Sequence, residues 1–327
     1  MRLRKIVIVG LLALAALLWS LPPAAEAQPA RRHYRIGVLN EAWAANHPTV
    51  EGLKVGLRDL GFEEGRDVTF DIRFTEGKPE ATSLAAADLA RTGVDLIFTS
   101  NEAATLAAKT ATQRIPVVFT LVGDPVATGI VRELARPDAN LTGVSSLTTE
   151  LVPKRLEALK TLIPSLRRVF AFYHGADVPS SAAIVRALEV APRLGLEIVP
   201  RTVLSPEQLD ELLKTLRAGD ALLAPDIATM DIPAIMLEVS LASRIPAVFS
   251  SELWVSHGGL VSYGADYRAQ GVQAARLVAK ILRGTRPRDL PVEGADKIDL
   301  AVNLKTARLL QVTVPRKVLL RADLLRR

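Results

Sequence analysis

The chain carries nearly the same short sequence twice, 130 residues apart: residues 114–120 read RIPVVFT and residues 244–250 read RIPAVFS. In each copy a proline opens an apolar run and a hydroxyl residue closes it, which is typical of a buried parallel strand. Each copy also follows an earlier apolar run, 94–98 or 220–223, and a helical stretch. The same β-α-β unit therefore occurs in both halves. It predicts two similar lobes, and the space between such lobes is the usual place for a ligand.

Strand and helix patterns alternate from residue 33 onward. The expected strands are 34–39, 68–74, 94–99, 116–120, 141–145, 168–173, 196–203, 221–224, 246–250, 260–263 and 297–302. The expected helices are 48–60, 79–91, 102–113, 150–162, 181–194, 205–216, 232–243 and 267–282, with a short one from Leu304. Such alternation forms parallel sheets with helices on both faces, so the sequence predicts an α/β fold of two Rossmann-like lobes. Ligands of these sheets bind at the carboxyl ends of the strands.

Two helix starts carry specific signals. Residues 205–208 (SPEQ) form a capping box with proline at the first helical position. Asp124 followed by Pro125 predicts another helix, because aspartate is a favoured N-cap and proline suits the first turn.

The first 27 residues have the pattern of a signal peptide. Arg2, Arg4 and Lys5 form a positive start, residues 6–21 are apolar, and small residues precede a cleavage point after Ala27. The alternative is a retained membrane anchor, but about 16 apolar residues are few for a membrane span. We therefore expect export with cleavage.

The chain contains no cysteine, which excludes disulfides, thiolate catalysis and cysteine-based zinc sites. It also excludes the lipid-modified cysteine that tethers some exported proteins to a membrane. With a cleaved signal peptide, this predicts a protein in the periplasm of a Gram-negative cell. The formal net charge is +6, and the basic residues are scattered over amphipathic helices. The sequence contains no helix-turn-helix and no basic-aromatic stripe, so we expect no nucleic-acid partner.

Motifs of catalysis and of cofactor binding are missing. No glycine-rich fingerprint follows the first strand, and the sequence has neither a Walker A motif nor G-x-S-x-G. The four histidines, His33, His47, His174 and His257, show no metal-ligand spacing; a lone loop histidine is more often a solvated surface residue than a ligand. We therefore expect no enzyme, no cofactor and no metal.

Polar and aromatic residues follow the ends of the expected strands, where a ligand would meet them. We predict that these residues bind the ligand: Asn40, Trp43, Ser100, Asn101, Gly123, Asp124 and Ser145 in the first half, and Tyr173, Asp226, Ser250, Glu252 and Trp254 in the second.

Several of these residues have a structural alternative. Asp124 and Asp226 could serve only as helix caps, although a helix N-terminus at a strand end also suits an anionic group. Trp43 and Trp254 could pack a loop or form a stacking platform for a flat ligand. Helix N-termini could hold a carboxylate while the acidic side chains hold an ammonium group, which suits an amino acid or a similar zwitterion.

An ordered series of segments carries a family resemblance. The segments are IPVVF (115–119), VGDPV (122–126), LARP (134–137), NLTG (140–143), GGLVSYG (258–264), DLPV (289–292) and NLKTA (303–307). From about Arg35 to Asp323, the chain resembles the ABC transporter substrate-binding proteins of the tryptophan-transporter-like family.

The resemblance implies a type I periplasmic-binding-protein fold, in which a three-strand hinge joins the lobes. The crossings would fall near residues 145–150, 257–259 and 284–290. The first lobe would then comprise 33–146 and 259–285, and the second lobe 147–258 and 286–327.

The chain departs from the family pattern at two places. Residues 136–140 read RPDAN where RPGGN is common, and residues 100–102 (SNE) replace small residues in the expected ligand loop. Some relatives bind tryptophan or other aromatic amino acids, but the second departure means that the resemblance does not identify the ligand.

The sequence thus predicts a monomeric periplasmic receptor that closes on a small molecule, an amino acid or an aromatic compound. It would deliver this ligand to an ABC permease and its ATPase. Ligand contacts with both lobes would favour the closed form. A receptor of the same fold that signals to a membrane kinase or chemoreceptor is the alternative, and an exported enzyme is a more distant one.

Overall fold

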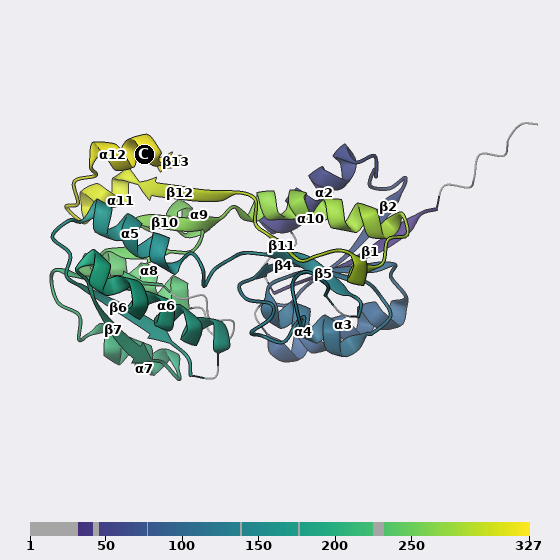
Figure 1. Ribbon diagram of the computed structural model, residues 1–327, viewed down its shortest axis with the longest axis horizontal. Helices are drawn as coiled ribbons and strands as arrows, with labels where there is room; N and C mark the ends of the chain where they lie inside the picture. The colour runs from purple at the N-terminus through teal and green to yellow at the C-terminus, as the bar shows by residue number, and fades with distance from the viewer. Residues whose placement is uncertain (1–31, 42–45, 77, 138, 176, 225–231) are drawn as a thin grey trace, which may run out of the picture. The chain divides into compact units, whose positions relative to one another are not determined.

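The computed structural model describes residues 32–41, 46–76, 78–137, 139–175, 177–224 and 232–327. The predicted signal peptide, Trp43 and Asp226 lie outside the described residues. Two sheets organise the chain from Tyr34 onward (Figure 1). None of the described helices has both the length and the apolar character that crossing a membrane requires.

The first sheet has six strands in the order β11-β5-β4-β3-β1-β2, and its described pairs are parallel. Its strands are β1 (Tyr34–Asn40), β2 (Val68–Phe74), β3 (Leu96–Ser100), β4 (Val117–Val122), β5 (Leu141–Ser145) and β11 (Glu293–Gly294). Helices α3 (Pro79–Thr92) and α4 (Glu102–Ala111) cover one face, and α2 (Pro48–Asp59) and α10 (Tyr267–Leu282) cover the other (Figure 1). The 3-10 helix η1 (Pro287–Asp289) contacts β5. We call this assembly the first lobe.

The second sheet has seven strands in the order β13-β12-β10-β9-β8-β6-β7. Its strands are β6 (Arg168–Tyr173), β7 (Glu197–Thr202), β8 (Asp220–Leu223), β9 (Ala247–Phe249), β10 (Val261–Ala265), β12 (Ile298–Asn303) and β13 (Leu324–Arg326). Helices α5 (Val152–Leu162), α6 (Val178–Leu194), α11 (Leu304–Leu309) and α12 (Arg316–Arg321) cover one face, and α7 (Pro206–Leu213), α8 (Ile232–Ser243) and α9 (Glu252–Ser256) cover the other. We call this assembly the second lobe.

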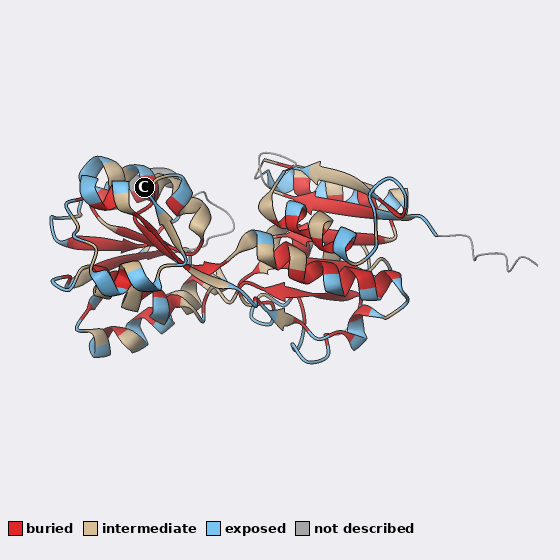
Figure 2. Cartoon of the chain, turned by 90° about the horizontal axis from the view of Figure 1, so that it is seen from above, coloured by how far each residue is buried: buried red, intermediate tan, exposed pale blue. Residues whose placement is uncertain are grey.

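The duplicated sequence forms a strand near the middle of each sheet. The first copy is β4, between β3 and β5, and the second is β9, between β8 and β10. Strands β3, β5, β8 and β9 are buried along their whole length (Figure 2). Burial on both faces explains why β8 and β9 carry continuous apolar runs instead of alternating ones.

Two crossings between the sheets lie later in the chain than the resemblance implies. Strand β10 pairs with β9 in the second sheet, so the second crossing follows Ala265 and not residues 257–259. Strand β11 pairs with β5 in the first sheet, so the third crossing follows Gly294 and not residues 284–290. Main-chain hydrogen bonds determine the sheet to which β10 and β11 belong. Local sequence patterns do not show which strands will pair.

Backbone hydrogen bonds connect the three crossings to one another. The amide of Ala295 donates to the carbonyl of Ser145, and the amide of Asp266 donates to the carbonyl of Lys297. The side chain of Lys297 also bonds Asp266, at 2.6 Å. The three connections therefore run side by side between the lobes.

The predicted capping box at the start of α7 is confirmed. The Ser205 hydroxyl accepts from the amide of Gln208 at 3.2 Å, and the Gln208 side chain accepts from the amide of Leu204 at 2.7 Å. The first bond satisfies an amide of the first helical turn, and the second reaches back to the amide of Leu204, the residue before the N-cap Ser205.

Candidate functional site

Six of the predicted residues lie at the carboxyl edge of the first sheet: Asn40, Ser100, Asn101, Gly123, Asp124 and Ser145. Strand register brings them together, because Asn40 is opposite Ser100 and Val122 is opposite Ser145. Ser100 is in turn opposite Thr120 near the end of β4. All six residues therefore lie at the same edge of the first sheet. Their role in ligand binding remains a prediction.

Asn101 is held in an unusual conformation at the start of α4. Its φ is 114°, which is rare for a residue other than glycine. Its side-chain oxygen caps the helix by accepting from the amide of Ala104 at 2.9 Å, and its Nδ2 donates to Glu41 at 2.6 Å. The other oxygen of Glu41 accepts from the Thr82 hydroxyl at 3.0 Å. These bonds fix the loop after β3.

Sequence reasoning missed Glu41, although its position could have indicated it. The residue directly follows β1, as Asn101 directly follows β3. Carboxyl ends of neighbouring parallel strands meet at one sheet edge, so polar residues after both strands should have been considered as a pair.

Two buried polar groups near this edge have no hydrogen-bond partner among the described residues. They are the hydroxyl of Ser100, which is 2% exposed, and the Nε2 of Gln270, which is 1% exposed. Gln270 lies on α10, and its Oε1 accepts from the amide of Leu121 at 3.5 Å, which places this side chain at the end of β4. Since buried polar groups nearly always have a partner, these two groups mark a place where a ligand or an ordered water completes the hydrogen bonding.

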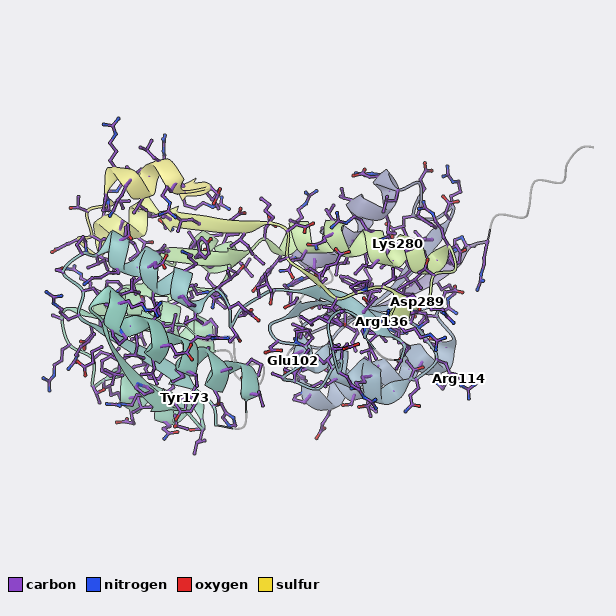
Figure 3. All side chains as sticks on the ribbon, in the orientation of Figure 1. Glu102, Arg114, Arg136, Tyr173, Lys280 and Asp289 are labelled. Carbon is purple, nitrogen blue, oxygen red and sulfur yellow. The ribbon has the colours of Figure 1, made fainter. Side chains whose placement is uncertain are left out.

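The carboxyl group of Glu102, two residues after Ser100, has a raised pKa. Burial raises the pKa of Glu102 to about 7, and the charges of Asp177 and Asp124 add to the effect. Glu102 lies in the first turn of α4 (Figure 3). Asp177 caps α6 by accepting from the amide of Ser180 at 2.7 Å. A nearby ligand cation would favour the charged form of Glu102. Glu102 directly follows the predicted Asn101, which is the signal that could have identified it.

Asp124 begins a turn and not a helix, so the predicted helix is wrong. One carboxylate oxygen accepts from the amides of Val126 at 3.1 Å and Ala127 at 2.9 Å. The segment 125–129 makes a turn that ends at Gly129, whose φ is 69°. The left-handed conformation of this glycine stops the chain after one turn, as it does at many helix ends.

Ser145 and Gly123 shape the backbone at the end of β5. The Ser145 hydroxyl donates to the carbonyl of Gly123 at 2.9 Å and accepts from the amide of Leu147 at 3.2 Å. The hydroxyl is thus engaged in holding the first crossing, which begins at this point.

In the second lobe, Tyr173 is the last residue of β6, and Ser250, Glu252 and Trp254 follow the end of β9. Tyr173 is half-buried (Figure 3), and the Glu252 carboxylate accepts from the Ser256 hydroxyl at 3.4 Å. Trp254 lies on the short helix α9, where its ring is stacked on Phe249 at 6.0 Å between centroids. This contact supplies the packing role that the sequence left open for Trp254, and ligand stacking by the other ring face stays a prediction.

A small pocket of about 20 Å³ lies near the carboxyl ends of β6 and β8. Its lining includes Phe172, Ala224 and Thr149, and the buried hydroxyl of Thr149 has no hydrogen-bond partner in the described part of the chain. The space suffices for one water molecule, which requires roughly 10–15 Å³.

Comparison with known proteins decides the family. Residues 43–325 match the family model described as ABC transporter substrate binding protein. The chain belongs to this family. The resemblance and the two-lobed α/β fold predicted from the sequence are thereby confirmed.

Individual relatives resemble this substrate-binding protein over most of its length. It is 28% identical over 272 residues to a tyrosine-binding protein of Clostridioides difficile, covering 81% of this chain and 78% of that protein. A crystal structure of a conserved domain protein from Vibrio cholerae superposes with a TM-score of 0.82 at 28% identity, covering 90% of this chain and 100% of that one. An ABC domain from Streptococcus pneumoniae in complex with L-Trp has the same fold, with a TM-score of 0.80 at 24% identity over 90% of this chain and 99% of that one.

Proposed function

We propose that this substrate-binding protein is the periplasmic solute receptor of an ABC importer and that it binds an amino acid with an aromatic side chain. The observation that carries the proposal is a pair of buried groups at the carboxyl edge of the first sheet, the Ser100 hydroxyl and Gln270 Nε2, which find no hydrogen-bond partner within the described residues. A ligand carboxylate would accept hydrogen bonds from both. Glu102 would hold the ammonium group, because a cation would offset the burial and the neighbouring negative charges that raise the pKa of Glu102.

The second lobe would complete the site when the hinge closes. Tyr173, Ser250, Glu252 and Trp254 are the residues that we propose to meet the ligand from that side. A tyrosine-binding relative and an L-Trp complex of the same fold support the class of ligand. The closed form would be favoured by contacts with both lobes, with no chemical step on this chain.

The cell location and the partners are part of the same proposal. The signal-peptide pattern at residues 1–27 and the absence of cysteine from the sequence support a receptor released into the periplasm, and we propose that it acts as a monomer. The closed receptor would deliver its ligand to a membrane permease with its ATPase.

A thermal-shift screen over amino acids, aromatic acids, nucleobases and sugars tests this function. A ligand at 100 times its Kd should stabilise the folded protein by about 2.7 kcal/mol. Ser100→Ala should weaken binding of that ligand about tenfold, since one hydrogen bond to a charged group is lost. The matched control is Ser83→Ala, the same change at an exposed position of α3. Stabilisation by sugars or nucleobases alone, or equal affinity of both variants, would contradict the proposal.

A further inference from the structure

The second lobe contains a larger pocket between α5 and α12. Its volume is about 160 Å³, and it shares no lining residue with the candidate site described above. Helix α5 supplies one wall through a stripe of side chains one turn apart, and the short helix α12 supplies the other.

The floor of this pocket is apolar. It consists of Ala158, Leu194, Tyr263, Leu300 and Val318. Tyr263 of β10 and Leu300 of β12 are direct partners in the antiparallel pair, so their side chains lie next to each other on one face of the sheet. The volume is close to that of an engineered apolar cavity of about 150 Å³ that binds benzene.

The rim of the pocket is strongly basic. Lys154, Lys160, Lys317 and Arg321 line it against one carboxylate, Glu157. Two of the cations have partners, since Lys154 pairs with Glu157 at 2.7 Å and Lys160 donates to the carbonyl of Leu166 at 2.7 Å.

The other two cations, Lys317 and Arg321, belong to α12 and make no hydrogen bond or ion pair with any described residue. They are four positions apart, so their side chains lie on the same side of this helix, where like charges destabilise each other. Long basic side chains often cover apolar surface while their charges stay in water. Here they leave a ring-sized space open above an apolar floor, and an anion in that space would offset the repulsion between them.

We propose that this pocket is a second small-molecule site, which binds an amphipathic anion of the class of aromatic or short-chain carboxylates. The apolar part of the ligand packs on the ring of Tyr263 and on Leu300. The carboxylate accepts from the guanidinium of Arg321, whose donor geometry suits both oxygens, and from the ammonium of Lys317.

Benzoate and hexanoate are the probes, and benzamide and hexanamide are their neutral counterparts. Binding of each to the full chain is measured by ligand-observed NMR titration. We expect saturable binding of the carboxylates and at least tenfold weaker binding of the amides. The double variant K317Q/R321Q should weaken benzoate binding at least tenfold. The matched control K305Q/R308Q removes two exposed charges from α11, outside the pocket, and should leave the affinity within twofold.

A pocket-filling variant tests the location without changing any charge. Ala158→Phe places a ring over the floor and should abolish benzoate binding. Retained binding to this variant, equal binding of benzoate and benzamide, or equal affinity of K317Q/R321Q and K305Q/R308Q would each overturn the proposal. Loss of benzoate binding in Ser100→Ala would overturn it too, by placing the probe in the first-lobe site, and would leave the proposed receptor function standing.

Discussion

The guanidinium of Arg155 donates a hydrogen bond from Nε to the main-chain carbonyl of Tyr263 at 2.9 Å. Its Nη1 donates to the carbonyl of Thr148 at 3.0 Å, and the side chain is only 2% exposed. Thr148 belongs to the first crossing and Tyr263 to β10, the strand that leads into the second. One buried side chain therefore holds two of the three connections between the lobes at their ends in the second lobe.

Arg155→Met should destabilise the protein by about 2–3 kcal/mol, because two buried carbonyls lose a charged donor. The measurement is urea unfolding followed by circular dichroism. Arg186→Met is the control, since Arg186 is exposed on α6 and pairs with Glu189, three residues away; such surface pairs contribute about 0–1 kcal/mol. Equal unfolding midpoints for the two variants would refute the structural role of Arg155.

Helices α2 and α10 pack so closely that only glycine fits at their contact. A Cβ on Gly271 would lie 2.0 Å from the carbonyl oxygen of Thr49, and a Cβ on Gly52 would lie 2.0 Å from that of Arg268. Glycine to alanine normally stabilises a helix by about 1 kcal/mol, but here the helices must separate. We expect Gly271→Ala to cost about 3 kcal/mol or more, measured as a lower thermal midpoint.

The control for this change is Gly175→Ala, because nothing lies within 4 Å of a Cβ at Gly175. This variant should unfold within a degree or so of the wild-type protein, as surface substitutions usually stay within about 0.5 kcal/mol. A Gly271→Ala protein as stable as the control would show that the two helices move apart at no cost.

The lobes themselves could be predicted from the sequence, since burial dictates the pattern that reveals them. A strand covered on both faces must be apolar throughout, which made β4 and β9 recognisable as copies. The capping box of α7 was equally readable because all of its bonds are local.

Features that depend on residues far apart in the sequence could not be predicted from it. The side of the hinge on which β10 falls is set by its pairing with β9 and β12. The site at the first sheet depends on Gln270, which reaches Leu121 across 149 positions of sequence. No local pattern could connect these two residues, so the carboxyl edge was predicted but the donor that Gln270 brings to it was not.

His47 is a half-buried helix cap and not the solvated loop residue that its surroundings suggested. Its Nδ1 accepts from the amide of Thr49 at 3.3 Å, and its ring is stacked on Tyr267 at 6.0 Å. Burial lowers the pKa of His47 to about 4 from 6.5. Between these values the unfolded chain binds the proton and the folded protein does not, so stability is complete above pH 6.5 and falls as the pH drops toward 4.

His47→Asn should remove this pH dependence while it keeps a good N-cap. Between pH 7 and pH 4, the free energy of unfolding of the wild type should fall by up to about 3 kcal/mol more than that of the variant. Urea unfolding at a series of pH values measures it, with His257→Asn as the control at an exposed histidine. Parallel pH curves for wild type and His47→Asn would contradict a lowered pKa of His47 in the folded protein.

Glu102 should give a pH dependence of the opposite sign. Burial, with Asp177 and Asp124, raises its pKa to about 7 from 4.5, so between these values the folded protein binds a proton that the unfolded chain lacks. Stability from this group is therefore lost as the pH rises from 4.5 to 7. Glu102→Gln should be more stable than wild type at pH 8, because it removes the ionised carboxylate. The gain should be only about 1 kcal/mol, since solvent screens a partly exposed charge.

Ligand binding gives the same residue a second signature. If Glu102 holds the ammonium group of an amino acid, the affinity of the wild-type protein should rise between pH 6 and pH 8 as the carboxyl group ionises, and that of Glu102→Gln should be lower and flat. Titration calorimetry at several pH values measures both. Glu133→Gln, at an exposed glutamate of the same lobe, should follow the wild type. If Glu102→Gln leaves the pH profile of affinity unchanged, Glu102 does not bind the ligand. This conclusion would hold even if the stability effect is found, because the effect on stability depends only on the burial and the charged neighbours of Glu102.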